Sequence, residues 1–353
     1  MKLADCVTQC RAPLVVQDCL TGRVTTLSGA ADCAAQVVRC QARFVLADDL
    51  TRLCTELAYS RGARNLACAD LLRVPAENLW VEWCNEPWQS SLELYGFPRA
   101  GERWQRAGHR GALIRSSPDG RRGILRTLWT GATELDVLVS SAEAYFDFDT
   151  PHGEEPQCAD QQGELASCVY DHACQGEDVL ARCFRFRYER TWSDYYRSAA
   201  LSRIESEAVW RHALGNIALD IPVLLAFLLL LASRVSLPRR LQTFERLNRA
   251  RRKTGKTPLL DHIEVRAPVL PEYLAGSRWE RQHLRRSPRL HHVRGHLVRR
   301  GSTLFWRVPH LRGHARSGVI RTRTVTWTFA DTAVGRASPI IAPTHAPTPR
   351  VAG

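Results

Sequence analysis

A pattern of two histidines and one arginine occurs twice near the end of the chain. His292-Val-Arg-Gly-His296 is followed by His310-Leu-Arg-Gly-His314. Histidine titrates near neutral pH and can move a proton, and the guanidinium of arginine binds phosphate through paired hydrogen bonds. The repeat therefore indicates phosphate binding or phosphate chemistry. A metal site and a hydrogen-bonded scaffold with Asp261 or Glu264 are the alternatives.

A shared metal ion is disfavoured by the spacing within each copy. Apolar residues alternate along positions 293–308, which predicts strands rather than a helix. Residues i and i+4 of a strand lie about 13 Å apart, so one ion cannot reach both His292 and His296. We expect no metal and no other cofactor.

The alternation predicts a β-hairpin with its turn at residues 300–302, in which His292, Arg294, His296 and Arg300 share one face of the first strand. Trp306 or Phe305 could stack on a base or fill the core. A basic segment upstream adds further cations. The predicted nucleic-acid contacts are Arg294, Arg299, Arg300, Trp306, Arg307, Arg312, Arg251, Arg252 and Lys253.

The charges of the chain are divided unevenly along its length. Residues 234–353 hold 25 Lys and Arg against 6 Asp and Glu, whereas residues 1–233 hold 24 basic and 30 acidic residues. A strongly basic half favours an anionic partner. We therefore predict a nucleic-acid-binding protein that contacts the phosphate backbone through the basic hairpin, with DNA or RNA as partner and the oligomeric state left open.

An enzyme is the alternative interpretation of the repeat. Metal-independent cleavage of RNA needs histidine to transfer protons and arginine to stabilise charge on phosphorus. The candidates in a ribonuclease or toxin-like enzyme are His292, His296, His310 and His314. No standard nucleotide-binding loop, zinc-protease motif or hydrolase elbow occurs.

The longest apolar run, residues 213–233, has two interpretations. Its uninterrupted part, 221–232, is about 18 Å long as a helix, shorter than a bilayer core, and extending it brings in Asp220. We expect a buried core helix. A single-pass protein spanning 213–233 is the second alternative, and Pro222 is expected to kink or divide the helix.

Twelve cysteines lie between Cys6 and Cys183, and none forms a C-x-x-C pair. The first residues, MKLADCVTQC, lack the apolar core of a signal peptide. We therefore expect buried, reduced thiols and a cytoplasmic setting.

Patterning along the chain predicts an α+β protein. Residues 30–75 should be mainly helical, 78–84 a strand, and the segments flanking Pro118-Asp119-Gly120 a pair of strands. The predicted regions are a mixed helical and β half (1–146), an acidic cysteine-containing loop or insertion (147–176), a helical region with the buried apolar helix (177–235), a basic β-rich module (236–332) with a strand at 318–329, and a disordered tail (333–353).

Two stretches carry a family resemblance. "LNRARRKTGKTPLLDHIEV" and "HHVRGHLVRRGSTLFWRVPHLRG", within residues 240–329, resemble segments of uncharacterised proteins encoded by bacteriophages and prophages, with a weaker match at "RVPAENLWVEW" (73–83). The resemblance implies a phage-derived protein in the cytoplasm of a bacterial host. It implies no particular reaction.

Overall fold

An inner strand buried on both faces lies at the centre of the fold. The sequence NLWVEWC forms strand β4 (Asn78–Cys84) in the computed structural model, as the pattern predicts, and Leu79 to Trp83 are all buried. A strand can be apolar on both faces only where helices cover both faces of its sheet.

The structure describes residues 2–9, 15–17, 24–26, 30–59, 71–93, 108–130, 137–140, 142–149, 183–188, 203–233, 237–268, 289–293, 296–300, 303–307, 310–312 and 314–319. The helices are α1 (Leu3–Gln9), α2 (Ala30–Arg39), α3 (Asp48–Tyr59), α4 (Asn85–Glu93), α9 (Arg203–Ala232) and α10 (Glu245–Lys253). The strands before residue 270 are β1 (Val15–Gln17), β2 (Val24–Thr26), β3 (Ala42–Leu46), β4, β5 (His109–Ser116), β6 (Arg122–Thr130), β7 (Val137–Val139), β8 (Ala142–Asp147), β9 (Phe184–Tyr188), β10 (Arg239–Gln242) and β11 (His262–Val265). The later strands are β12 (Arg289–Val293), β13 (His296–Arg300), β14 (Thr303–Arg307), β15 (His310–Arg312) and β16 (His314–Val319).

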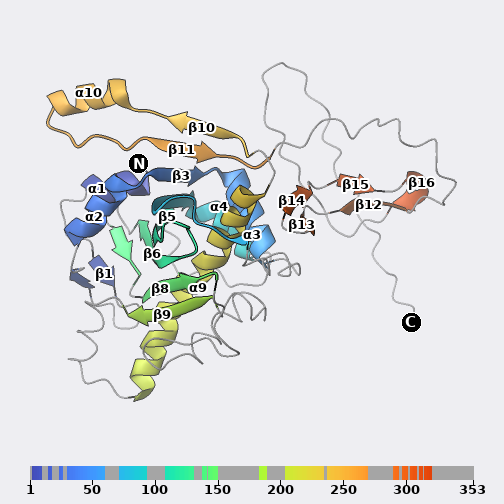
Figure 1. Cartoon of the computed structure of the whole chain (residues 1–353), viewed down its shortest axis with the longest axis horizontal. Helices are drawn as coiled ribbons and strands as arrows, with labels where there is room; N and C mark the ends of the chain where they lie inside the picture. The colour runs from blue at the N-terminus through green and yellow to red at the C-terminus, as the bar shows by residue number, and fades with distance from the viewer. Residues whose placement is uncertain are drawn as a thin grey trace, which may run out of the picture. The chain divides into compact units, whose positions relative to one another are not determined.

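The α+β prediction is confirmed by one large mixed sheet and its covering helices (Figure 1). The strand order is β10-β11-β3-β4-β5-β6-β7-β1-β2, and β8 and β9 extend the sheet from β6. Strands β11, β3 and β4 are parallel to one another, and the other neighbours from β4 to β7 are antiparallel. Helix α3 connects β3 to β4, which makes these three elements a βαβ unit.

Two clusters of buried side chains cover the two faces of this sheet. Side chains from α1 and α2 pack on one face with Trp80, Leu113 and Leu128. Side chains from α3, α4 and α9 pack on the other with Leu79 and Ile114. Successive residues of β4 and β5 therefore belong to different clusters, as the alternation of a strand requires.

Glu82 attaches α1 to the sheet through a buried carboxylate. Its oxygens accept the backbone N–H groups of Leu3 at 3.2 Å and Ala4 at 3.0 Å and the indole N–H of Trp80 at 2.9 Å. Because the first N–H groups of a helix have no partner within it, a carboxylate at this position satisfies them and interacts favourably with the helix dipole.

The apolar run forms a buried helix, as predicted. Residues 221–230 of α9 are buried, and the helix packs against α3, β6, β8 and β14. The helix continues through Pro222, so the expected division does not occur. No helix in the described ranges has the length and apolar character of a membrane span.

A buried ion pair fixes α9 on the sheet. Arg110 of β5 donates from Nε and from a terminal nitrogen to the two carboxylate oxygens of Asp220, each at 2.8 Å. The guanidinium also lies 4.5 Å from the ring centroid of Trp88 and 5.4 Å from that of Trp129. Burial raises the pKa of Asp220, and the neighbouring Arg110 opposes that shift.

The turn predicted at Pro118-Asp119-Gly120 joins β5 and β6. Gly120 has φ of 71°, and a Cβ there would lie 2.2 Å from the carbonyl oxygen of Val74. Glycine is required at this position for both reasons.

Two predicted helical regions contain strands instead. Residues 42–46 form β3 between α2 and α3, and Phe184–Tyr188 forms β9 within the stretch expected to begin a long helix. Both strands form hydrogen bonds with partners distant in sequence, β11 for β3 and β8 for β9. Long-range pairing overrides local helical spacing here.

The predicted boundary before residue 236 does not separate two units. Strands β10 and β11 belong to the main sheet, because β11 pairs in parallel with β3. The first compact unit comprises Met1–His283 and His292–Leu311, and the second comprises Leu284–His291 and Arg312–Gly353. In the second unit β12 and β16 are parallel, with Arg289 opposite His314. The predicted loop at 150–176, the tail and positions 320–329 of the predicted strand lie outside the described residues.

Six of the cysteines lie in the described ranges. Five of them are buried, as expected, and Cys84 is partly exposed.

Removing one member of the Arg110–Asp220 pair should strongly destabilise the fold. We expect Asp220→Leu to lower the free energy of unfolding by about 3–5 kcal/mol, because it leaves Arg110 as an unpaired buried charge. The double variant Arg110→Met/Asp220→Leu should recover most of this loss. Urea denaturation measures both.

The exposed pair Arg249–Glu245 provides the control, and Glu245→Gln should leave the denaturation midpoint unchanged. Equal destabilisation by the single and double core variants would show that the ion pair is not what holds α9.

Candidate nucleic-acid interface

Each copy of the histidine repeat extends from one strand into the next. His292 is in β12 and His296 in β13, and His310 is in β15 and His314 in β16. Arg294 lies between β12 and β13 outside the described residues, so the predicted common face of His292, Arg294, His296 and Arg300 stays a prediction. Strand β13 pairs with β14, and β12 pairs with β15, which begins at His310 of the second copy.

The predicted hairpin is present, and its described strand pairs are β13 with β14 and β12 with β15. Strands β13 and β14 are antiparallel, with Leu297 opposite Trp306 and Arg300 opposite Thr303, so the connection falls at 301–302 as expected. Leu297 and Trp306 are each 7 % exposed and join the core cluster that contains α9. Trp306 therefore fills the core, and its predicted role in stacking on a base is wrong.

The other face of the hairpin carries the cations. His296, Arg300 and Arg307 alternate with the buried positions, and His296 lies directly opposite Arg307. Arg300 and Arg307 are exposed, and the partly buried Phe305 lies on the same face between them. Phe305 therefore lies among the cations, which is the position expected of an aromatic residue that stacks on a base.

The remaining predicted contacts are distributed differently. Arg299 and Arg312 are exposed, and Arg299 shares its face of β13 with the buried Leu297. Arg294 lies outside the described residues, as do the side chains of His292, His310 and His314. Asp261 accepts the backbone N–H of Phe244 and Glu264 binds Arg266, and the scaffold alternative stays a prediction.

A basic helix, α10, forms the second cationic element. Its sequence is ERLNRARRK, and its only buried residue is Asn248. A nine-residue helix with no buried apolar side chain is unstable in isolation, because nucleation is costly and no burial offsets it. Contacts with the rest of the protein must therefore hold it in place.

Asn248 supplies the main attachment. Its side-chain amide donates to the carbonyl of Leu259 at 2.8 Å and accepts the N–H of Leu259 at 2.7 Å. Arg251, three residues later on the same side of the helix, donates to the carbonyl of Thr257 at 2.8 Å and to Oε1 of Gln9 at 3.0 Å. Arg251 thus has a structural role, and its predicted contact with nucleic acid stays a prediction.

Two carboxylates complete the attachment of this segment. Asp5 of α1 accepts the N–H of Leu260 at 2.8 Å, and Asp261 accepts the N–H of Phe244 at 2.9 Å. Asp5 is 4 % exposed, and burial raises its pKa, with a smaller contribution from Glu82. The hydrogen bond from Leu260 acts in the opposite direction.

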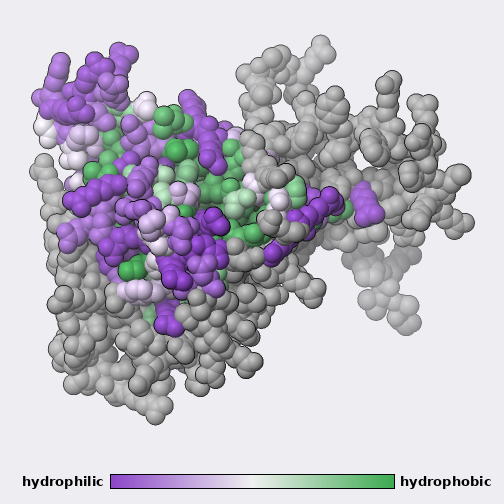
Figure 2. Space-filling view, in the orientation of Figure 1, coloured by the Kyte–Doolittle hydropathy of each residue, from purple (hydrophilic) through white to green (hydrophobic). Residues whose placement is uncertain are grey.

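The inner side of α10 is thus occupied by structural contacts, and its outer side is left cationic. Hydrophilic residues gather over α10 and β10 in the space-filling view (Figure 2). Glu245 is paired with Arg249, and Glu264 with Arg266. The exposed cations of this segment for which no ion pair occurs within the described residues are Arg239, Arg240, Arg246, Arg252, Lys253 and Lys256.

This arrangement suits phosphate binding. Arg and Lys side chains held on one helix and one strand can contact successive phosphates, and nearby acids are too few to neutralise them. Among the described residues no group of His, Cys, Asp and Glu side chains is arranged to hold a metal. The predicted contacts on α10 were Arg251, Arg252 and Lys253, whereas its attachment by Asn248 was not predicted.

Comparison with known proteins gives no relative for this chain, since no family model, curated protein or solved structure matches it.

Loss of the Asn248 amide should release α10. We expect Asn248→Ala to lower the free energy of unfolding by about 1–3 kcal/mol, because both polar groups of Leu259 lose their partner. Hydrogen exchange of the α10 amides should accelerate, with those of β4 unchanged. Arg252→Ala, on the outer side, should alter neither quantity, and unaltered α10 exchange in Asn248→Ala would contradict the proposed attachment.

Neutralising Asp5 should affect stability in a pH-dependent way. Because the folded-state pKa of Asp5 lies above its unfolded value of 3.8, the native carboxylate is disfavoured once the pH rises past that value. Asp5→Asn keeps an oxygen to accept the Leu260 N–H and carries no charge. We expect it to be more stable than the parent at pH 7 and equal to it below about pH 3.8. Denaturation measured from pH 3 to 7 tests this prediction. It would be contradicted if the Asp5→Asn variant became less stable than the parent as the pH rises.

Proposed function

We propose that this protein binds nucleic acid, contacting the phosphate backbone through the outer cations of α10 and β10 and through the outward face of the β13–β14 hairpin. The observation that carries the proposal is that a short, strongly basic helix is held to the protein by Asn248 and Arg251, and its outer cations face solvent. Counterion release from the phosphates would drive binding at such a surface.

The hairpin adds a second point of contact of the same kind. Arg300 and Arg307 supply guanidinium groups for phosphates, and Phe305 between them offers an aromatic ring for stacking on an unpaired base. Stacking would favour a single-stranded partner at this element. The cations of α10, which carry no aromatic neighbour on the helix, would contact backbone without regard to base.

The family resemblance suggests the biological setting. Its two main stretches include α10 and the β13–β14 hairpin, the two elements assigned to binding. We therefore propose a phage or prophage protein acting on nucleic acid in the cytoplasm of a bacterial host. The ribonuclease alternative gains no support here, because its four histidines lie on four strands and only His296 has a described side chain.

Three double variants, each removing two positive charges, test the binding surface. Arg252→Gln/Lys253→Gln alters α10, Arg300→Gln/Arg307→Gln alters the hairpin, and Arg73→Gln/Arg115→Gln alters exposed cations elsewhere. Binding of the full chain to mixed-sequence duplex DNA and single-stranded RNA is measured from about 50 to 200 mM salt.

We expect the first two variants to reduce the slope of log affinity against log salt by about 1.8 for duplex DNA and about 1.4 for RNA, because each lost phosphate contact releases less counterion. The third variant should behave as the parent. The proposal is wrong if the full chain does not bind either polymer, if its affinity ignores salt, or if all three variants weaken binding equally.

A further inference from the structure

A cavity of about 510 Å³ opens at the carboxyl ends of the three parallel strands. Helix α3 follows β3 directly, and α4 follows β4 directly. The chain therefore leaves the sheet at the ends of these strands, and space remains beside them. Open sheets with parallel strands bind ligands in this location. The side chains that line the cavity are Lys2, Val45, Leu46, Ala47, Asp48, Asp49, Cys84, His109, Glu264 and Arg266.

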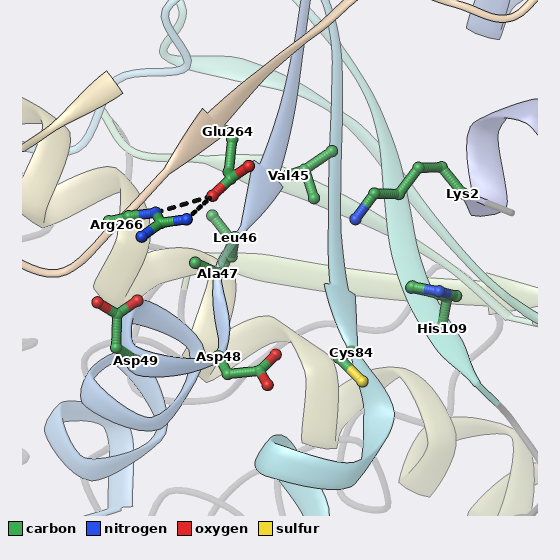
Figure 3. A pocket seen from close by; sticks show the side chains of 10 residues that line it. All are labelled: Lys2, Val45, Leu46, Ala47, Asp48, Asp49, Cys84, His109, Glu264 and Arg266. Atoms are coloured by element: carbon green, nitrogen blue, oxygen red, sulfur yellow. Dashed lines mark hydrogen bonds and ion pairs between the residues drawn. The ribbon is translucent and has the colours of Figure 1, made fainter. Parts of the chain in front are cut away.

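Cys84 and His109 lie next to each other in the wall of this cavity (Figure 3). Cys84 is the last residue of β4 and His109 the first of β5, and the two are directly opposed in the antiparallel pair. Opposed residues have Cβ atoms about 4.5–5.5 Å apart. The thiol and the imidazole therefore come from paired positions of two neighbouring strands at the surface of one cavity.

Cys84 differs from the other cysteines that the structure describes. Those five are 0–5 % exposed within the core, whereas Cys84 is partly exposed and lines the cavity. Its Sγ lies 3.6 Å from the carbonyl oxygen of Gly108, and it also accepts a hydrogen bond from the backbone N–H of Glu86 in the first turn of α4. These contacts aim the sulfur without burying it.

The protonation states suit a thiol with a neutral base beside it. Burial raises the pKa of Cys84, and Asp48 and Glu86 add to the rise. Burial lowers the pKa of His109, and Lys2 contributes to the lowering, although Glu82 and Asp48 oppose it. The Nδ1 atom of His109 is buried with no hydrogen-bond partner in the described part of the chain. A neutral imidazole with a free nitrogen can accept a proton.

We propose that this cavity is an acyl-transfer site in which Cys84 is the nucleophile and His109 the general base, acting on small esters or thioesters. The Cys84 sulfur forms a bond to the acyl carbon while His109 takes the thiol proton, and the bond to the leaving group breaks. The protonated His109 returns that proton to the leaving group. Water, deprotonated by His109, then hydrolyses the thioester and restores the thiol, so the net reaction is hydrolysis.

Charged groups at the two sides of the cavity define which acyl donors fit. Lys2 extends into the cavity from one side, and Asp48 faces it from the other (Figure 3). The apolar residues Val45 and Leu46 of β3 also line the cavity. Neither Lys2 nor Asp48 has an ion pair within the described residues. An ammonium group can stabilise the negative charge that develops on the acyl oxygen. Short acyl groups are favoured, because the aliphatic part of the lining is limited to Val45, Leu46 and Ala47.

The acyl-transfer site is independent of the nucleic-acid interface. It shares no residue with α10 or the hairpin, and Cys84→Ser keeps every cation of the proposed binding surface. Failure of either proposal therefore leaves the other unaffected, provided that nucleic-acid binding is measured on the same preparations.

Acylation of the full chain by p-nitrophenyl acetate tests the proposal. We expect a burst of p-nitrophenolate, with the acetyl group found on the Cys84 peptide by mass spectrometry. Cys84→Ser should abolish the burst, and His109→Gln should slow it about 100-fold, since a general base contributes on the order of 10²–10⁴ in rate. Cys40→Ala, which removes a buried thiol, should acylate at the parental rate.

Near-parental circular dichroism and unchanged nucleic-acid affinity would show that the variants are folded. Acetyl groups found only on other residues, or a His109→Gln rate within about threefold of the parent, well short of the expected general-base contribution, would overturn the proposal.

Discussion

The Arg110–Asp220 pair is the interaction on which the rest of the structure depends. It joins β5 to α9 across 110 positions of sequence, and both side chains are almost completely buried. Burying two charges is costly, and only matched geometry with further contacts offsets that cost. Here the two hydrogen bonds and the faces of Trp88 and Trp129 provide those contacts, so α9 has one favourable position on the sheet.

That position determines what the apolar part of α9 can cover. The buried run begins at Ile221, directly after the paired Asp220, and Tyr59 of α3 donates to the carbonyl of Leu219 at 2.8 Å. The same helix receives the apolar face of the β13–β14 hairpin through the core cluster. Because Leu297 and Trp306 point into the core, the cations on the opposite face of the hairpin point away from it. The alternation of side-chain direction along β13 and β14 therefore accounts for both the core packing and the charged surface of the hairpin.

Local patterns predicted the elements that depend on neighbouring residues. Strand β4, the turn at Gly120, the buried helix and the β13–β14 connection all follow from periodicity and turn residues. The misassigned elements depend on distant partners: β3 between two helices pairs with β11, whose sequence begins at His262. Likewise, the main attachment of α10 is the side-chain amide of Asn248, and no apolar spacing marks it.

Strand β10 has a consequence for the behaviour of the protein at high concentration. It ends the large sheet with only four residues, and Leu241 is 65 % exposed beside Arg239 and Arg240. An open edge with an apolar side chain is a template for pairing with another molecule. Two such edges approaching one another would bring four guanidinium groups together, and their mutual repulsion would keep separate molecules from joining into fibrils. Anions that screen this repulsion would weaken the protection, so colloidal stability should depend on the buffer in which the protein is kept.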